Sequence, residues 1–192
     1  MQVKAFGDYQ TNCYIYKNII IDPGMGATNW VLKNVTNPKA ILLTHGHFDH
    51  IWSVAELKEK LNIPVYIHKE DEFMLSDDIF GMGVPKTSAD ILIQNDETME
   101  IDGIEINFKH FPGHTPGSMT IEIDEFMFSG DFIFKGSIGR FDFPYSDKFE
   151  MKKSLNKFLG LNYDKIILPG HGDKTTIKNE QINIKNYWLG AI

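Results

Sequence analysis

The amino-acid sequence predicts an α/β protein in which two mixed β-sheets pack together and carry helices on their outer faces. Short apolar segments typical of strands occur along the whole chain, and segments with helical spacing lie between and after them. Because an apolar sheet face must be covered by another layer, this order favours two packed sheets with helices outside. No linker or low-complexity tract divides the 192 residues, so we expect one domain over residues 1–192.

Strands and helices alternate in the first half of the chain. Two strands are expected around the Lys17-Asn18 turn, because β-branched and aromatic residues flank it and Pro23-Gly24 follows. Later strands are short apolar runs, and helices show apolar residues three or four apart. The expected elements are two strands within 13–22, a strand at 39–43, a helix at 52–61, a strand at 65–67 and a short charged helix at 69–75.

The middle of the chain is irregular and the second half is rich in β-structure. Residues 76–98 mix Gly, Pro, Asp and Ser with few apolar periods, and such long stretches are usually functional or mobile, so we expect a lid beside the site. The elements expected after it are strands at 104–108, 118–123 and 126–129, a helix at 147–159, a buried strand at 165–168 and a helix at 178–189 that starts after Thr175-Thr176.

Composition excludes several classes of protein. Apolar residues make up 42% and charged residues 23%, which indicates a folded globular chain. The net charge of -7, without a Lys/Arg cluster, disfavours nucleic acid as a partner. No stretch approaches a membrane span or a signal peptide, and the single cysteine, Cys13, suits a reducing compartment. We therefore expect a cytoplasmic protein that acts on a small molecule, with no membrane or nucleic-acid partner; the oligomeric state stays open.

The segment THGHFDH, residues 44–50, concentrates potential metal ligands between a strand and a helix. His45 and His47 lie two residues apart on an extended loop and can point toward one metal, whereas Asp49 and His50 at the start of the helix can face a second. Gly46 between them allows a close approach of the backbone. Four ligands in six residues rarely serve packing alone, so this segment predicts a metal site.

Further ligands must come from elsewhere, because four residues cannot close two metal sites and leave a position for water. His114, Asp131 and His171 each follow an apolar strand where polar turns begin. Strand ends are where functional residues gather, because the rigid sheet positions them. These three residues are therefore the predicted partners of the first segment.

Each ligand candidate also has an ordinary structural interpretation. Asp131 alone would be a turn former and Asp49 alone a helix N-cap, although a carboxylate can cap with one oxygen and bind metal with the other. His68 and His110 have no partners at ligand spacing and are interpreted as structural. Cys13, within an apolar strand pattern, is interpreted as a core residue.

Taken together, these motifs resemble the metallo-β-lactamase superfamily and, within it, the glyoxalase II-like hydrolases. The resemblance rests on IIIDPG (19–24), THGHFDH (44–50), PGHTPGS (112–118), SGD (129–131) and LPGHG (168–172), in that order. It implies a four-layer αβ/βα sandwich of two mixed sheets. It also implies that Asp22 supports the metal loop from beneath.

The resemblance further implies a binuclear site. The implied ligands are His45, His47 and His114 for one metal, Asp49, His50 and His171 for the other, and Asp131 as the bridge. Di-iron flavoprotein relatives tend to carry a carboxylate at the position of His47, so a histidine there favours the hydrolytic branch and two Zn²⁺ ions, with iron or manganese as alternatives.

The chemistry expected of such a site is metal-assisted hydrolysis. Two metals sharing a water would lower its pKa toward about 7, and the resulting hydroxide would attack a thioester or ester carbonyl. Asp49 and Asp131 would orient that water by hydrogen bonding, without acting as free bases. No side-chain nucleophile is needed.

The segment GRFDF, residues 139–143, is the only local indication of a substrate contact. It resembles a GRxDF segment of glyoxalase II-like and persulfide dioxygenase-like members, in which Arg140 would hold a substrate carboxylate; the alternative is an ion pair with Asp142 or Asp147. Asp142 stands where glyoxalase II proteins carry a tyrosine, and only one helix is expected after residue 176 in place of their helical domain. Both differences put glutathione thioesters in doubt.

Other functions known for this superfamily are alternatives to thioester hydrolysis, of which a nuclease is disfavoured by the acidic net charge. A mononuclear iron persulfide dioxygenase would use His45 and His114 with either Asp131 or His47. A β-lactam hydrolase fits the fold but not the expected cytoplasmic location. A non-catalytic metal-binding module would not need seven ligands.

Overall fold

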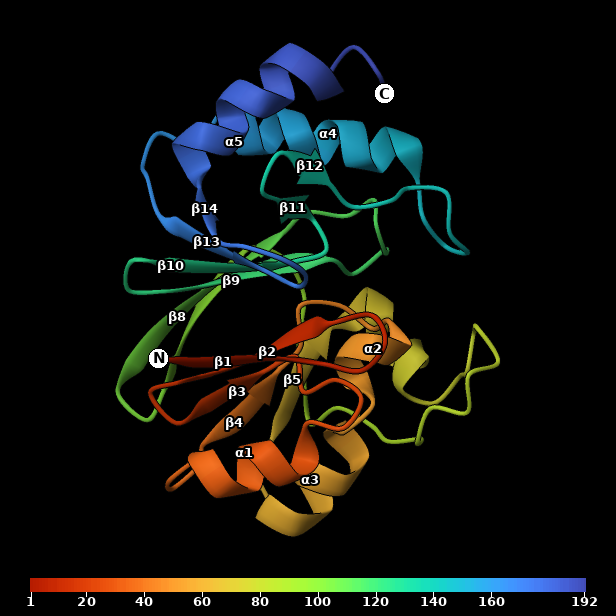
Figure 1. The fold of residues 1–192 in the computed structure, drawn as a ribbon, viewed down its shortest axis with the longest axis vertical. Helices are drawn as coiled ribbons and strands as arrows, with labels where there is room; N and C mark the ends of the chain where they lie inside the picture. Colours follow the sequence, from red (N-terminus) through yellow and green to blue (C-terminus); the bar gives the residue numbers. More distant parts are fainter.

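The computed structural model describes residues 1–192, which form two six-stranded sheets packed face to face (Figure 1). The first sheet contains, in spatial order, β1 (Gln2–Phe6), β2 (Thr11–Tyr16), β3 (Ile19–Ile21), β4 (Ala40–Leu42), β5 (Val65–His68) and β6 (Ile91–Ile93). Strands β1 to β3 pair antiparallel, and β3 to β6 pair parallel. The predicted mixed sheet is confirmed.

The second sheet is built from the later part of the chain and is mostly antiparallel. Its spatial order is β14 (Thr175–Thr176), β13 (Ile166–Pro169), β10 (Phe126–Gly130), β9 (Met119–Ile123), β8 (Ile104–His110) and β7 (Glu97–Ile101). The pair β10 and β13 is parallel. A small hairpin of β11 (Ile133–Phe134) and β12 (Ser137–Ile138) follows β10.

Helices cover the outer face of each sheet, which gives four layers (Figure 1). The helical segments of the first half are α1 (Thr28–Asn34), α2 (Phe48–Ile51), α3 (Val54–Leu61) and the 3-10 helix η1 (Lys69–Leu75). Those of the second half are α4 (Lys148–Leu159), α5 (Ile177–Asn183) and the π-helical turn η2 (Ile184–Trp188). None of these helices has both the length and the apolar character needed to cross a membrane.

The alternation of apolar residues explains the layers. In β3, Ile19 and Ile21 point into the core between the sheets, while Ile20 packs toward α1 and α3. A third apolar cluster fills the space between the second sheet and α4 and α5, with Met127 and Ile167 contributed by the strands. Three apolar interfaces therefore separate four layers, as the implied sandwich requires.

Several boundaries differ from the sequence-based expectations. Helix α3 begins at Val54, because residues 48–51 already form the separate short helix α2. The expected C-terminal helix 178–189 is divided, since α5 ends at Asn183 and continues as η2. Residues 76–98 are not irregular throughout, because they contain β6 and the start of β7.

Other elements carry no clear signal in the sequence. Strand β1 is an edge strand of only five residues, and because four of them are exposed it buries little apolar surface on either face. Helix α1 is short, and no side chain caps its N-terminus.

The topology gathers the important loops at one edge of the sandwich. In the parallel pair β3 and β4, the carboxyl ends lie side by side, and Asp22 and His45 follow these ends closely. In the parallel pair β10 and β13, Asp131 and His171 follow in the same way. Parallel pairing within each sheet therefore brings residues far apart in the sequence to the same edge.

Candidate metal centre

The structure brings together all seven residues that the sequence singled out, and they are called the ligand cluster below. His45 and His47 lie between β4 and α2, Asp49 and His50 belong to α2, His114 lies between β8 and β9, Asp131 follows β10 and His171 follows β13. Within the cluster, three groups each place their potential ligand atoms within 4.8 Å of one another. The groups are His45, His47 and His114; His45, His50 and Asp131; and Asp49, His50 and His171.

Asp131 lies between the group of His45, His47 and His114 and the group of Asp49, His50 and His171. Its Oδ1 is 3.3 Å from His50 Nε2, and its Oδ2 is 3.4 Å from His171 Nε2 and 3.5 Å from His114 Nε2. One carboxylate thus reaches both groups, since its Oδ2 contacts a histidine of each, and this is the placement that a bridging ligand needs.

Unpaired buried atoms show that the cluster fits metal ions. The Nε2 atoms of His45, His47, His50 and His114, together with Asp131 Oδ1, are buried and have no hydrogen-bond partner. Buried polar atoms are normally paired, so these exceptions need an explanation. Ligands about 2.1 Å from a tetrahedral zinc lie roughly 3.4 Å apart. The cluster's contacts of 3.3 to 3.5 Å match this spacing.

The charges in the cluster also suit metal binding. Burial lowers the pKa of His47 to about 3, and burial and neighbouring histidines lower the pKa of His45. Burial opposes ionisation of Asp49, but His50 and His171 beside it bring its pKa down to about 2. Neutral imidazoles and ionised carboxylates are the forms that bind metal. His50 and His171 depart from this pattern, because the carboxylates beside them outweigh burial. Asp49, Asp131 and Asp22 raise the pKa of His50, and Asp131 and Asp49 raise that of His171 to about 9.

Asp22 supports the first ligand segment from beneath, as the sequence predicted. Its Oδ2 accepts hydrogen bonds from His50 Nδ1 at 3.0 Å and Thr44 Oγ1 at 2.6 Å, and its Oδ1 accepts from Thr44 N at 2.8 Å. Its backbone is in the left-handed region, with φ of 48°, which Asp tolerates better than most residues. A carboxylate that orients the far side of a ligand imidazole fixes which nitrogen faces the metal.

A second buried carboxylate, Asp71 in η1, was not found from the sequence. Its Oδ2 accepts from Gly46 N at 2.9 Å and Thr115 Oγ1 at 2.6 Å, and its Oδ1 accepts from Gly117 N at 2.6 Å. Asp71 therefore joins the loop that carries His45 and His47 to the loop that carries His114. Burial raises its pKa to about 6, although the three hydrogen bonds act in the opposite direction.

Backbone carbonyls orient two more imidazoles. His114 Nδ1 donates to the carbonyl of Arg140 at 2.7 Å, and His171 Nδ1 donates to the carbonyl of Tyr9 at 2.9 Å. Since a carbonyl can only accept, these bonds place the proton on Nδ1 and leave the Nε2 lone pair facing the cluster. Nothing in the sequence around Tyr9 signals this role.

Gly46 is required by packing against η1. A Cβ atom at this position would lie 2.6 Å from Met74 Cβ. We expected the close approach to be toward the metal site, but the crowded side of Gly46 faces η1. By contrast, a Cβ atom at Gly170, in the segment LPGHG (168–172), would lie 2.6 Å from His50 Cε1. The absence of a side chain at Gly170 therefore makes room for the candidate ligands.

A cavity of about 510 Å³ opens above the ligand cluster. Phe80 and Met82 from the expected lid region line it, so this region does lie beside the site; its movement stays a prediction. Arg140 also lines the cavity, and its guanidinium forms two 2.8 Å hydrogen bonds with Asp142. The ion pair considered for Arg140 is therefore formed, and its contact with substrate stays a prediction.

The two remaining histidines lie outside the cluster. His68 and His110 stack on each other with ring centroids 3.9 Å apart, and their Nε2 atoms bond to the backbone carbonyls of Gln94 and Pro116. Cys13 is fully buried in the core beneath α1 and α3. These residues are structural, as interpreted from the sequence.

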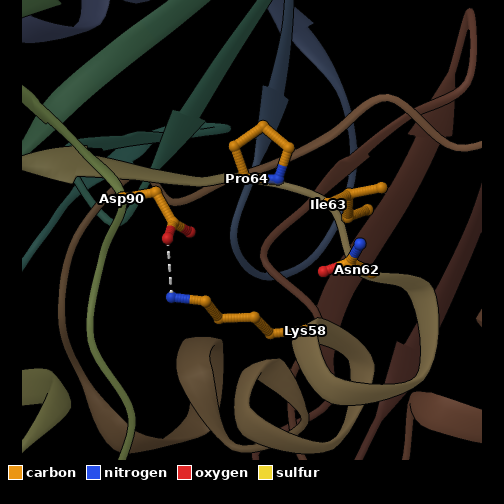
Figure 2. A pocket seen from close by; sticks show the side chains of 5 residues that line it. All are labelled: Lys58, Asn62, Ile63, Pro64 and Asp90. Carbon is orange, nitrogen blue, oxygen red and sulfur yellow. Dashed lines mark ion pairs between the residues drawn. The ribbon is translucent and has the colours of Figure 1, made fainter.

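Another hollow, of about 240 Å³, is shown in Figure 2 and lies where α3 ends and β5 begins. Its two charged side chains, Lys58 and Asp90, bind each other and the backbone. Lys58 Nζ is 3.0 Å from Asp90 Oδ1 and donates to the carbonyl of Ser88, while Asp90 Oδ2 accepts from Val65 N. Because it adjoins the start of β5, it lies at the opposite edge from the ligand cluster, which follows the end of the parallel strand β4.

Comparison with known proteins agrees with this geometry. The model of the family described as the metallo-beta-lactamase superfamily matches residues 6–171. The hydroxyacylglutathione hydrolase GloC of Haemophilus influenzae is 36% identical, over 90% of this chain and 91% of that protein. The probable metallo-hydrolase YqgX of Bacillus subtilis is 33% identical, over 91% of each chain.

Two solved structures of comparable size share the fold. The BLEG-1 B3 metallo-beta-lactamase superposes with a TM-score of 0.86, at 33% identity over 98% of both chains. TTHA1623, in a di-iron-bound form, superposes with a TM-score of 0.80, at 33% identity over 94% of this chain and 96% of that one. With its four layers, its clustered ligands and these relatives, the chain belongs to the metallo-beta-lactamase superfamily.

Proposed function

We propose that this chain is a binuclear metal-dependent hydrolase of small thioesters or related esters. The observation that carries the proposal is a pair of three-residue ligand groups linked by Asp131, with buried ring nitrogens that have no partner within the protein. The relative named as a hydroxyacylglutathione hydrolase supports the thioester class.

His45, His47 and His114 would hold one ion, and Asp49, His50 and His171 the other, with Asp131 shared between them. We choose zinc because a set of imidazoles and carboxylates suits it, and iron is the main alternative because a relative was solved with two irons. Such ions, when bound, polarise a carbonyl oxygen and acidify water.

The chain's own residues would position the reactants. The carboxylates of Asp49 and Asp131 have pKa values below the ordinary range, so both are ionised at neutral pH and can accept a hydrogen bond from the attacking water. The hydroxyl of Thr11 donates to Asp49 Oδ2 at 2.7 Å and holds this carboxylate in place. The cysteine thiol of Cys13 lies in the core, so it offers no competing nucleophile.

The alternative of a mononuclear iron persulfide dioxygenase requires only one ligand group. It gives no role to Asp49, His50 and His171, although these three residues converge as closely as the other group. The binuclear hydrolase uses the whole cluster, which is why we favour it.

The deciding experiment is metal quantification on the purified protein, together with an activity screen on S-lactoylglutathione, simple thioesters and glutathione persulfide. We expect two zinc ions per chain and thioester hydrolysis that a chelator abolishes. A His47→Ala variant that remains folded by circular dichroism should lose hydrolysis. One iron per chain with oxygen uptake on the persulfide would contradict the proposal.

A further inference from the structure

The cavity above the ligand cluster has a lining that hydrolysis itself does not require. Half of its 14 lining residues are aromatic or aliphatic, and they are called the apolar wall below: Tyr9, Phe48, Phe80, Met82, Phe134, Ile138 and Phe143. They come from segments far apart in the sequence, namely the β1–β2 turn, the start of α2, the segment after η1, the β11–β12 hairpin and the loop before α4. A cavity of about 510 Å³ is large enough for a small ligand.

The aromatic side chains form a continuous surface that reaches the ligand rings. The ring centroids of Tyr9 and Phe48 are 5.2 Å apart, and those of Phe48 and Phe80 are 5.6 Å apart. Phe80 and Phe143 lie 5.2 and 5.9 Å from the ring of His47. Any carbonyl that reacts at the cluster therefore has its substituent next to apolar side chains.

The opposite side of the cavity is also apolar. The ring centroid of Phe134 lies 6.1 Å from that of His171, and the buried side chain of Ile138 lines the same space. The wall thus offers a substrate few hydrogen-bond donors, since only Tyr9 in it carries a hydroxyl, and Ser137 adds one more to the lining of the cavity. Such a lining favours apolar groups, because burying a polar group without a partner costs free energy.

Apart from the ions that the ligand cluster would hold, the lining of the cavity offers little positive charge to an anionic substrate. Arg140 is its only Lys or Arg side chain, and both Nε and Nη2 donate to the carboxylate of Asp142 at 2.8 Å. The guanidinium also lies over the ring of Phe143, 4.3 Å from its centroid. A glutathione thioester carries two carboxylates, so even a released Arg140 could pair with only one of them.

From these observations we infer that the cavity binds apolar acyl groups, so that the substrates are thioesters or esters of aliphatic or aryl-substituted acids with an uncharged leaving group. This inference rests on the proposed hydrolytic function, because it names the substrate class of the same site. The apolar wall holds the acyl group, the ligand cluster holds the carbonyl, and the Arg140–Asp142 pair remains closed at the rim.

A series of substrates with matched leaving groups tests the inference on the metal-loaded protein. We compare acetyl, butanoyl and hexanoyl thioesters of N-acetylcysteamine, which is uncharged, with lactoyl and hexanoyl thioesters of glutathione. We expect kcat/KM to rise about two- to fourfold per added methylene, which is the effect of burying one such group. Hexanoyl-N-acetylcysteamine should exceed S-lactoylglutathione by tenfold or more.

Two variants probe the apolar wall and the rim pair separately. Met82→Lys places a cation in the apolar wall, at a side chain that is 40% exposed. The variant should weaken the dependence of kcat/KM on acyl chain length and should raise kcat/KM for glutathione thioesters. Leu32→Lys is the matched control, because Leu32 lies in α1 outside the cavity and is 37% exposed. This variant should change neither the dependence on acyl chain length nor kcat/KM for glutathione thioesters. Asp142→Ala frees Arg140 and should raise kcat/KM for glutathione thioesters about three- to tenfold, with neutral thioesters unchanged.

The outcomes separate this inference from the proposed function. If S-lactoylglutathione is the better substrate and Arg140→Ala lowers its kcat/KM tenfold, the apolar class is wrong while thioester hydrolysis stands. If no thioester is hydrolysed, the proposed function fails. Calorimetric Kd values for non-hydrolysable S-alkyl-N-acetylcysteamine thioethers then still decide the specificity of the cavity: affinity that rises with chain length supports it, and affinity independent of chain length overturns it.

Discussion

The ligand cluster and the apolar wall share one cavity but are held in place in different ways. Three of the five imidazoles of the cluster, those of His50, His114 and His171, are oriented by the Asp22 carboxylate or by backbone carbonyls, and Asp71 joins two of the loops that carry the cluster. The wall consists mainly of ring contacts between residues on turns and loops. Only Ile138 of the seven wall residues is buried, whereas His45, His47, His50 and His114 all are.

Because of this difference, we expect the ligand cluster to determine the rate of the reaction and the apolar wall to determine which substrates are preferred. A change in the cluster alters a network in which several groups depend on one another, so its effect should be large and independent of the substrate. A change in the wall alters one contact with the substrate, so its effect should depend on the acyl group. The predictions below test this separation, from the largest effect to the smallest.

Asp131→Asn removes the charge of the carboxylate that contacts both ligand groups. We expect less than one equivalent of tightly bound metal and a loss of hydrolysis of at least about a thousandfold, because the metals supply several kcal/mol of transition-state stabilisation. Metal analysis and kcat/KM measure both effects. Asp102→Asn, at an exposed position outside the cluster, is the control. A variant that kept full metal content and activity would remove Asp131 from the site.

Asp22→Asn should weaken the site without removing a ligand. The amide can no longer accept from both His50 Nδ1 and Thr44 with two charged oxygens, so we expect a loss of about 10- to 100-fold in metal affinity. Titration against a competing chelator measures it. If affinity remained unchanged while the melting temperature fell, Asp22 would serve only the fold.

Asp71→Asn should have a smaller effect on activity and a distinct effect on stability. An amide offers one accepting atom where Asp71 uses two oxygens for three donors, so we expect roughly a two- to tenfold loss of kcat/KM for every thioester alike. A loss that depended strongly on the acyl chain would instead place Asp71 with the apolar wall.

The raised pKa of Asp71 also predicts a pH dependence in the metal-free protein. Because its pKa is about 6 when folded and near 3.8 when unfolded, the ionised form is disfavoured by folding, and the unfolding free energy should fall as pH rises from about 4 to 6. Titration of Asp71 should change the unfolding free energy by at most about 3 kcal/mol. Urea denaturation of wild type and Asp71→Asn across this range measures it; parallel curves for the two proteins would show that Asp71 does not titrate there.

Arg140→Ala should have the smallest effect. The side chain is 63% exposed and paired with Asp142, so we expect kcat/KM for neutral thioesters to change less than about twofold and the melting temperature to stay the same. Its backbone carbonyl, which accepts from His114, is unaffected by the substitution. A large loss on neutral substrates would show that the wall and the cluster are not separate.

The fold and the convergence of the seven candidate ligands could be predicted from the sequence, because both depend on local patterns. The strand at residues 19–21 is a continuous run of three β-branched residues, and four of the seven candidate ligands lie within residues 45–50. The other ligands follow strands directly. The supporting role of Asp22 was available only through the family resemblance, and the geometry agrees with it.

The remaining features depend on tertiary contacts that no local pattern encodes. Asp71 lies in the acidic run Glu70-Asp71-Glu72, and nothing in the sequence distinguishes the one buried carboxylate from its exposed neighbours. The wall residues are aromatic or aliphatic residues from separate segments of the chain. The choice between the two interpretations of Arg140 required the position of Asp142, which the sequence alone does not give.

The division of the ligands between the two sheets has a consequence for assembly. His45 to His50 follow β4 of the first sheet, whereas His114, Asp131 and His171 extend from the second. The chain has a single cysteine and therefore no internal disulfide, so bound metal ions would be its only cross-links between the two halves. Because His50 and His171 come together only when the two sheets are packed, metal uptake would mark the completion of folding and would then stabilise the edge of the sandwich at which the cavity opens.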